Sequence, residues 1–201
     1  MSLSRNRQDG LLLVISGPSG VGKTTITRRV EQALGAVFSV SMTTRPKTAA
    51  DTEGQDYIFV SPGQFELHRD AGDLLEWAEV FGQSYGTPRQ PVEEHLGSGR
   101  LVLLEIDVEG AIQIKQRMPL ALALFVRPPS ELVLLERLRS RQRDDEQSIQ
   151  RRFAKAKDEI ARGRACGIYD HFITNDDLDT AVAEVVRWVR CSWHGGGQCE
   201  A

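Results

Sequence analysis

Gly17-Pro18-Ser19-Gly20-Val21-Gly22-Lys23-Thr24 is the stretch of sequence that decides the fold. It fits the pattern G-x-x-x-x-G-K-[ST], an apolar run at residues 11–16 precedes it, and an amphipathic segment at residues 25–34 follows it. A buried strand that enters such a loop and a helix that leaves it form the phosphate-binding unit of P-loop proteins. The pattern therefore predicts a site for a nucleoside triphosphate.

The residue types in this loop suit the chemistry of a polyphosphate. Glycines let backbone N–H groups turn inward where side chains would obstruct them, and the start of the helix adds partial positive charge. We expect Lys23 to contact the β- and γ-phosphates of the nucleoside triphosphate and the Thr24 hydroxyl to ligate Mg²⁺. Thr25, the next residue, completes the ATP-binding stretch that the loop predicts.

Beyond the loop, short apolar runs alternate with amphipathic segments, which is the pattern of a parallel sheet flanked by helices. The sequence thus predicts an α/β fold with a P-loop core. Strands are expected at residues 11–16, 37–41, 101–106, 121–126 and 172–174, and helices are expected to begin near Lys23, Pro88, Val108, Ser130, Glu146 and Leu178. Thr87 followed by Pro88 suits an N-cap with proline at the first helical position.

Residues 57–81 interrupt this alternation with a short apolar run, a small helix after Ser61 and a second apolar run at residues 74–80. We interpret about 43–87 as an inserted, mostly β lobe within one domain at 11–190, whose core comprises 11–42 and 88–190. Residues 1–10 and 191–201 are polar or glycine-rich, and both ends are expected to be flexible.

Composition excludes several classes of function. The 201 residues carry a net charge of −3, so broad binding to nucleic acid or to an anionic membrane is not expected. No apolar run approaches the roughly 18 residues of a membrane span. The three cysteines (Cys166, Cys191 and Cys199) are an odd number at wide spacing, which is typical of a reducing compartment and predicts a cytoplasmic protein. Cys191, His194 and Cys199 lack a fourth ligand, so a loose tail is favoured over a metal site.

A series of further motifs follows the loop in order along the chain: SVSMTTR at 39–45, GQDYIF at 54–59, LEWA at 75–78, YGT at 85–87, LEID at 104–107 with Gly110, PPS at 128–130 with Arg137 and Arg141, then Arg152, and NDDL at 175–178. In this order the motifs resemble the guanylate kinase family over about residues 12–189. The resemblance implies transfer of the γ-phosphoryl group of ATP to GMP, and to dGMP, with Mg²⁺ as the cofactor.

The resemblance also implies a role for each matching residue. Glu76 corresponds to the carboxylate that faces guanine, whose N1–H and N2–H₂ donors lie side by side and suit an ionised acceptor. The family also places two hydroxyls near the guanine O6, which here are those of Ser41 and Thr87. Asp107 corresponds to a second acid that contacts the base. The residues that clamp the GMP phosphate in the family correspond to Arg45, Tyr57 and Tyr85. Asn175 joins the ATP site. Phosphoryl transfer is implied to depend on Lys23, Arg45, Arg137, Arg141 and Arg152, the last three in a lid at about 137–152.

One departure from the family pattern concerns the contact with the acceptor phosphate. The family carries a second arginine three residues after the first, where this chain has Thr48, and the nearest cation is Lys47. Either Lys47 reaches the acceptor phosphate as a point charge or this contact is missing, since lysine does not reproduce the bidentate fork of arginine. We expect a weakened GMP interaction rather than a loss of activity.

Two other functions remain open from the sequence. A non-catalytic guanylate-kinase-like interaction module would share the fold, but the intact Lys23 and Thr24 speak against it. A P-loop kinase for another acceptor, such as AMP, UMP or a sugar phosphate, is disfavoured by Glu76 and the two hydroxyl positions. The expected partners are ATP and GMP, without nucleic acid or membrane, and the protein is expected to be a monomer or a homodimer.

Overall fold

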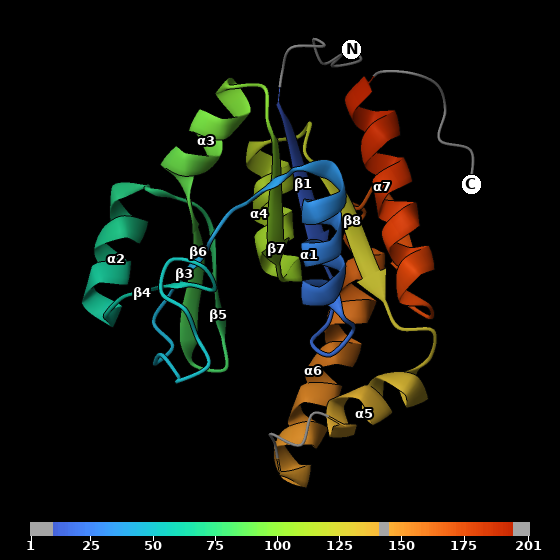
Figure 1. The fold of residues 1–201 in the computed structure, drawn as a ribbon. Coiled ribbons are helices and arrows are strands. Elements are labelled where there is room, and N and C mark those ends of the chain that lie inside the picture. The colour runs from blue at the N-terminus through green and yellow to red at the C-terminus, as the bar shows by residue number, and fades with distance from the viewer. Residues whose placement is uncertain (1–9, 141–144, 195–201) are drawn as a thin grey trace.

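The computed structural model describes residues 10–140 and 145–194 and contains a five-stranded core sheet and a smaller second sheet (Figure 1). The core sheet has the order β2-β7-β1-β8-β9 and is parallel throughout. Its strands are β1 (Leu11–Ser16), β2 (Val37–Phe38), β7 (Leu101–Ile106), β8 (Leu122–Arg127) and β9 (His171–Thr174). The expected α/β fold with a parallel core is confirmed.

Helices cover both faces of this sheet because the side chains of β1 alternate between two apolar clusters. Leu11, Leu13 and Ile15 pack with residues of α1 and α7, whereas Leu12 and Val14 pack with residues of α3 and α4. The helices of the core are α1 (Lys23–Leu34), α3 (Arg89–Gly97), α4 (Val108–Arg117), α5 (Glu131–Ser140), α6 (Glu146–Ala165) and α7 (Leu178–His194). Both faces of β1 are therefore buried, which explains its uninterrupted apolar sequence.

The second sheet has the order β4-β3-β6-β5 and lies beside the core, where α4 contacts β5 (Figure 1). It consists of β3 (Met42–Thr43), β4 (Ile58–Phe59), β5 (Leu74–Val80) and β6 (Gln83–Pro88), and α2 (Pro62–Ala71) packs on it through Phe65. The antiparallel pair β5–β6 turns at Phe81 and Gly82, which both have positive φ. This four-stranded sheet with α2 is called the lobe below.

Two predicted elements differ in the structure. The apolar run at 37–41 forms a strand of the core sheet only at Val37–Phe38, because the chain then crosses over and Met42–Thr43 pairs within the lobe. Thr87 is not an N-cap: both Thr87 and Pro88 belong to β6, and helix α3 begins at Arg89. The pairing of β6 with β5 takes precedence over the local capping signal at these two residues.

Helix α7 corrects the predicted start of the C-terminal tail, since it continues through His194, four residues beyond Arg190. Its apolar residues Ala181, Val185 and Val189 are fully buried against the core, and Trp193 of the added turn packs against the same cluster. Arg141 and Cys199, which were both singled out in the sequence, lie outside the described residues. Within residues 10–140 and 145–194, no helix is long and apolar enough to span a bilayer.

Candidate active site

The phosphate-binding loop joins β1 to α1 at the carboxyl edge of the core sheet, where ligands of open α/β sheets bind. Gly22 has a left-handed φ of 95°, and a Cβ atom there would lie 2.5 Å from the Asn175 Nδ2 atom, so only glycine fits. Lys23 Nζ donates to the carbonyl oxygens of Gly17 and Pro18 at 2.6 and 3.0 Å. The Lys23 ammonium therefore joins the end of the loop to its beginning, and its charge lies next to the loop backbone.

Asn175 and Arg137 lie on the other side of this loop, as the sequence predicts for the ATP site. Asn175 Nδ2 donates to the Val21 carbonyl at 2.8 Å, and Arg137 Nη1 donates to the Asn175 carbonyl at 2.9 Å. A cavity of about 270 Å³ lies between these elements and is lined by Gly20, Gly22, Thr25, Arg137, Ser140, Asn175, Asp176 and Leu178. Four of the ten predicted ATP-binding residues, Gly20, Gly22, Thr25 and Asn175, therefore line one hollow beside the loop.

Helix α6 contacts the loop from the lid side through Arg152 and Glu159. Arg152 Nη2 donates to the Ser19 hydroxyl at 2.8 Å. The Glu159 carboxylate is 15% exposed and lies near Lys23, and its Oε2 atom has no hydrogen-bond partner among the described residues. Burial raises the pKa of Glu159, while the charges of Lys23 and Lys155 lower it. Sequence reasoning missed Glu159 because nothing distinguishes it within a charged helix.

A second cavity, of about 260 Å³, joins the loop to the lobe. The residues that line it include Lys23 with Gly17 and Ser19 from the loop, and five of the seven predicted acceptor residues: Ser41, Tyr57, Glu76, Tyr85 and Asp107. The two halves of the predicted site, a triphosphate loop and an acceptor pocket, thus meet in one cavity. We call it the transfer cavity.

Glu76 on β5 is the buried acid of the transfer cavity, with 3% of its surface exposed. The fully buried Thr87 hydroxyl donates to Glu76 Oε1 at 2.6 Å. The pKa of Glu76 is raised to about 7, chiefly by burial and also by the nearby charge of Asp107, whereas the Thr87 hydrogen bond and the charge of Arg117 act in the opposite direction. Asp107 itself caps α4 by accepting from the Gly110 backbone N–H at 2.9 Å. The pocket therefore holds a buried carboxylate that can accept donors from a ligand.

The raised pKa of Glu76 predicts how stability depends on pH. The folded protein holds the proton more tightly than the unfolded chain, so this stabilisation is complete below about pH 4.5 and is lost as the pH rises through about 7. Glu76→Gln keeps an acceptor for Thr87 but does not ionise. Relative to wild type, its free energy of unfolding should therefore rise by on the order of 3 kcal/mol between about pH 4.5 and 8. Urea titrations at both pH values measure this difference, and a constant difference would contradict the buried ionisation.

Arg45, predicted to clamp the acceptor phosphate, is held in the lobe by Asp51. Arg45 Nη2 and Nη1 donate to the two Asp51 carboxylate oxygens at 2.8 and 3.0 Å. The guanidinium carbon lies 5.2 Å from the centroid of the Tyr57 ring, and the rings of Tyr57 and Tyr85 meet edge to face at 5.7 Å. Burial raises the pKa of Tyr57 to about 12, so its phenol is a neutral donor. The structure brings the three predicted clamp residues together.

The departure from the family pattern lies in the segment that follows Arg45. Thr48, at the position of the missing arginine, donates to Asp51 Oδ2 from both its backbone N–H and its hydroxyl, at 2.7 and 2.6 Å. Lys47 Nζ lies 4.0 Å from Glu53 Oε2 and 5.9 Å from the centroid of the Phe59 ring. Lys47 therefore pairs within its own loop in this conformation.

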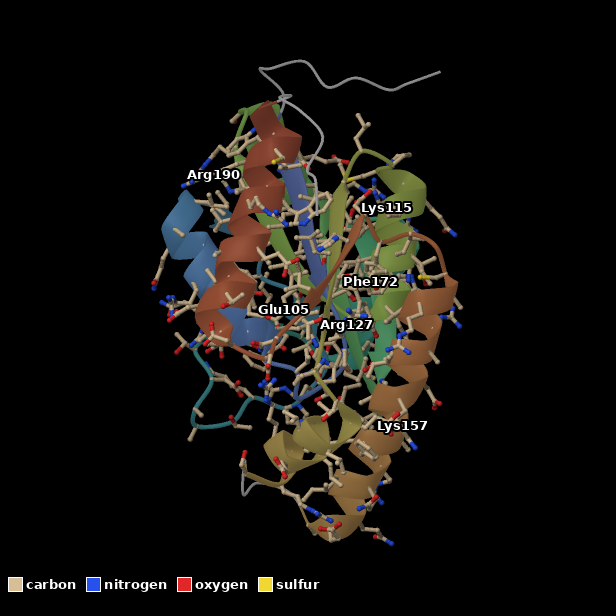
Figure 2. The ribbon with its side chains drawn as sticks, turned by 90° about the vertical axis from the view of Figure 1, so that its right-hand side faces the viewer. Glu105, Lys115, Arg127, Lys157, Phe172 and Arg190 are labelled. Atoms are coloured by element: carbon tan, nitrogen blue, oxygen red, sulfur yellow. The ribbon has the colours of Figure 1, made fainter. Side chains whose placement is uncertain are left out.

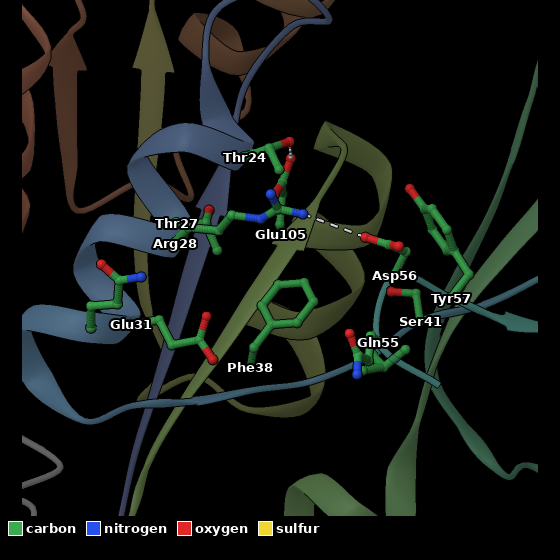
Figure 3. A pocket seen from close by; sticks show the side chains of 12 residues that line it. Thr24, Thr27, Arg28, Glu31, Phe38, Ser41, Gln55, Asp56, Tyr57 and Glu105 are labelled. Atoms are coloured by element: carbon green, nitrogen blue, oxygen red, sulfur yellow. Dashed lines mark hydrogen bonds and ion pairs between the residues drawn. The ribbon is translucent and has the colours of Figure 1, made fainter. Parts of the chain in front are cut away.

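A third cavity, of about 650 Å³, separates α1 from the start of the lobe (Figure 3). Thr24 lies at its upper end, where its hydroxyl donates to Glu105 Oε1 at 2.8 Å. Arg28 of α1 reaches Asp56 of the lobe across it at 3.4 Å, in the second contact drawn there. This cleft leaves space between the core and the lobe, and one ion pair bridges it.

Glu105 is a second residue of the site that sequence reasoning missed. It lies at the carboxyl end of β7, two residues before Asp107, and Figure 2 labels it near the middle of the molecule. An acid at the end of a buried parallel strand was available as a signal, because such positions commonly face a site. Its contact with Thr24, and its place in the lining of the transfer cavity with Lys23, show that Glu105 belongs to the phosphate-binding end.

A phosphate-binding loop that shares a cavity with a second, base-sized pocket defines a class of protein, the P-loop kinases of small phosphorylated acceptors. Comparison with known proteins then identifies the family. The family model for guanylate kinase matches residues 9–191, so this chain belongs to the guanylate kinase family.

Individual relatives support the assignment over nearly the whole chain. A guanylate kinase of Gloeobacter violaceus is 50% identical over 177 residues, which cover 88% of this chain and 85% of that protein. A guanylate kinase of Anaeromyxobacter dehalogenans is 46% identical over 189 residues, covering 93% and 83%. The crystal structure of guanylate kinase from Anaplasma phagocytophilum superposes with a TM-score of 0.76 at 32% identity, covering 92% of this chain and 87% of that one.

Proposed function

We propose that this chain transfers the γ-phosphoryl group of ATP to GMP in the transfer cavity, giving ADP and GDP. It is a nucleoside monophosphate kinase by its family, and its match with curated guanylate kinases at 45–50% identity supports the activity. One observation carries the proposal furthest: the buried Glu76 carboxylate opens into the same cavity as Lys23 of the phosphate loop.

Glu76 selects the base. Guanine presents N1–H and N2–H₂ side by side, and an ionised carboxylate accepts from both. Adenine presents an acceptor at N1, which would leave the buried carboxylate unpaired and repelled. Thr87 holds Glu76 in place through its 2.6 Å hydrogen bond, and Ser41 and Asp107 line the same cavity. The remaining polar groups of guanine, O6 and the amino group, are assigned to these residues.

Arg45, Tyr57 and Tyr85 bind the GMP phosphate at the lobe end of the cavity. The two phenols add hydrogen-bond donors without adding charge, and the guanidinium supplies the cation. Their arrangement around one ring cluster supports this role.

The donor nucleotide lies against the phosphate loop. Backbone N–H groups of Gly17 and of residues 19–25 cradle its phosphates, and Lys23 neutralises the β- and γ-phosphates. Asn175 and Arg137 line the hollow beside the loop. Arg152, already in contact with Ser19, and Arg141 are assigned to the charge of the group in transfer. The lid comprises about residues 137–152.

Transfer itself requires alignment rather than a strong base. An oxygen of the GMP phosphate is already anionic, so it attacks the γ-phosphorus of ATP while the bond to the β–γ bridging oxygen breaks and ADP leaves with that electron pair. Water in the cavity would hydrolyse ATP, so the lobe at about 43–87 and the lid close over the core at 11–42 and 88–190. The cleft bridged by Arg28 and Asp56 supports such a closure.

Mg²⁺ fits the oxygen donors at the loop. The Thr24 hydroxyl and the adjacent Glu105 carboxylate are hard oxygen donors, which this ion prefers. The described parts of the chain contain no group of three or more His, Cys, Asp and Glu that could hold a metal. This agrees with a site completed by water and substrate phosphates, as is usual for Mg²⁺. When bound, Mg²⁺ offsets negative charge on the β- and γ-phosphates; Thr24 is its proposed protein ligand, with Glu105 orienting the hydroxyl.

We further propose a cytoplasmic monomer or homodimer whose partners are ATP and GMP, with dGMP as an alternative acceptor. The net charge of −3 argues against broad binding to nucleic acid or to an anionic membrane, and the cysteine pattern supports a reducing compartment.

An acceptor panel tests the proposed function. Purified protein is given ATP, Mg²⁺ and one acceptor at a time, among them GMP, dGMP, AMP, UMP and a sugar phosphate, and ADP release is coupled to a spectrophotometric assay. We expect ADP with GMP and dGMP and little with the others. Equal rates with AMP would contradict the role of Glu76, and no turnover with any acceptor would favour a non-catalytic interaction module.

Lys47 gives a prediction about the missing arginine. Because Lys47 pairs with Glu53 and lies against Phe59, Lys47→Ala should change the KM for GMP by less than about threefold, the scale of an exposed ion pair. Arg45→Ala, measured in parallel, should raise this KM by about 10-fold or more, since it removes a charged hydrogen-bond fork. A KM increase in Lys47→Ala comparable to that of Arg45→Ala would show that lysine replaces the arginine.

A further inference from the structure

The hydrogen bonds of Arg45 leave a defined part of its guanidinium available. An arginine has five N–H donors. Three of them are used here: Nη1 donates to Asp51 Oδ2 at 3.0 Å and to the Pro46 carbonyl at 3.1 Å, and Nη2 donates to Asp51 Oδ1 at 2.8 Å. Within the described residues, no partner is found for Nε or for the second N–H of Nη2. Two of the five donors therefore remain for a ligand.

These two remaining donors are neighbours. Nη2 is the terminal nitrogen on the same side of the guanidinium as the Nε–H, so the pair forms a second fork with two parallel N–H bonds. Such a fork matches two oxygens of one phosphate, as it does two oxygens of a carboxylate. Asp51 occupies the end of the guanidinium and leaves this side fork intact.

Asp51 is itself firmly held. Its carboxylate accepts from Arg45 and from the backbone N–H and hydroxyl of Thr48, and its side chain is 14% exposed. The hydrogen bonds from Arg45 and Thr48 hold the pKa of Asp51 well below its usual range, so the acid stays ionised. The rings of Tyr57 and Phe59 lie 5.2 and 5.3 Å from the guanidinium carbon. Both partners of the pair are thus fixed before any ligand binds.

We propose that Asp51 is a positioning residue for GMP: it anchors the outer end of Arg45 so that the Nε–Nη2 side fork faces the phosphate of the acceptor. Thr48, at the position where the family has its second arginine, contributes by anchoring Asp51. This inference rests on the proposed function, because it assigns the fork to the GMP phosphate. Tyr57, which lines the transfer cavity and contacts Arg45, connects the fork to that cavity.

Asp51→Asn tests the proposal. The amide keeps the size of the side chain but loses one acceptor oxygen and the charge that pairs with Arg45. We expect the KM for GMP to rise about 10-fold or more, while the KM for ATP and kcat stay within about twofold. Thr48→Val should raise the KM for GMP in the same direction, by about threefold, because it removes one of the two bonds from Thr48. Asp51→Glu should recover part of the loss because it restores the charge.

A comparison of GMP with guanosine separates positioning from general damage to the lobe. Competition assays give the inhibition constant of guanosine, which lacks the phosphate that Arg45 would bind. We expect this constant to be unchanged in Asp51→Asn. Asp70→Asn is the matched control, since Asp70 also pairs with a neighbouring arginine of the lobe, Arg69 at 2.8 Å, but lies on exposed α2.

The outcomes are distinguishable. If the KM for GMP is unchanged or lower in Asp51→Asn, the inference is overturned; a lower value would mean that the Asp51 carboxylate occupies the place of the phosphate. If the affinity for guanosine falls as much as that for GMP, Asp51 serves the fold of the lobe alone. If the wild-type protein makes no GDP from ATP and GMP, the proposed function fails whatever the variants do.

Discussion

Lys23→Met is expected to lower kcat for GDP formation by about 10³-fold or more, because a cation that neutralises transferring phosphate contributes on this scale. Lys23 lies over the phosphate loop, with its ammonium donating to the Gly17 and Pro18 carbonyls. Methionine has a similar length but neither charge nor donors, so negative charge on the γ-phosphate stays uncompensated as the bond breaks. Steady-state and single-turnover rates with ATP and GMP measure the loss.

Binding of the acceptor should survive this substitution. Lys23 contributes one edge of the transfer cavity, whereas the base and phosphate of GMP are assigned to the lobe, so the dissociation constant of GMP should change by less than about threefold. Lys157→Met is the matched control: Lys157 is exposed on α6, at the edge of the molecule in Figure 2, and should keep wild-type rates. Near-normal turnover by Lys23→Met would refute the role given to the loop lysine.

The phosphate loop was predictable from sequence because its chemistry is local. Backbone conformation, the lysine and the threonine all lie within eight consecutive residues, and the strand and helix around them have strong periodicity. Strands whose apolar runs are buried on both faces, such as Leu11–Ser16 and Leu101–Ile106, were located to the residue for the same reason.

The crossing from core to lobe was not predictable in this way. Residues 37–41 read as one strand because apolar and small residues continue, yet the chain leaves the core sheet after Phe38. The choice depends on which sheet offers a pairing partner, and that is set by residues far along the chain, such as Tyr85 and Gly86 opposite Thr43 and Met42. Likewise, Thr87 carries a valid capping signal that pairing with Glu76 overrides.

The site shows the same division. Glu76, Asp107 and Tyr57 came from motif order, and the structure adds the contacts that motifs do not encode. Glu159 lies near the phosphate loop because α6 packs close to it in the folded chain. The role proposed for Asp51 depends on its hydrogen bonds to Arg45. Ionic contacts between segments distant in the chain leave no periodic pattern in the sequence. From the sequence alone, a charged residue in such a contact cannot be distinguished from one that faces solvent.

Glu76→Gln is expected to lower kcat/KM for GMP by about 10²- to 10³-fold, because it replaces a doubly accepting carboxylate with an amide that accepts once and sets its own N–H₂ against a guanine donor. The same change removes the charge that repels the N1 acceptor of adenine, so kcat/KM for AMP should stay level or rise. The ratio of kcat/KM for GMP to kcat/KM for AMP, measured in one assay, should therefore fall by at least as much as the value for GMP alone.

The pH dependence of this variant separates recognition by charge from recognition by shape. GMP binds the ionised form of Glu76, whose pKa is raised to about 7 in the empty pocket. As the pH falls from about 8 to 6, the protonated form increasingly competes with binding, so the wild-type KM for GMP should rise by about 10-fold. Glu76→Gln has no such proton, and its KM should follow only the titration of the GMP phosphate, which both proteins share. The Glu76 carboxyl group must lose its proton before it can accept from both N1–H and N2–H₂ of guanine. Parallel pH profiles for the two proteins would therefore mean that Glu76 does not bind guanine in its ionised form.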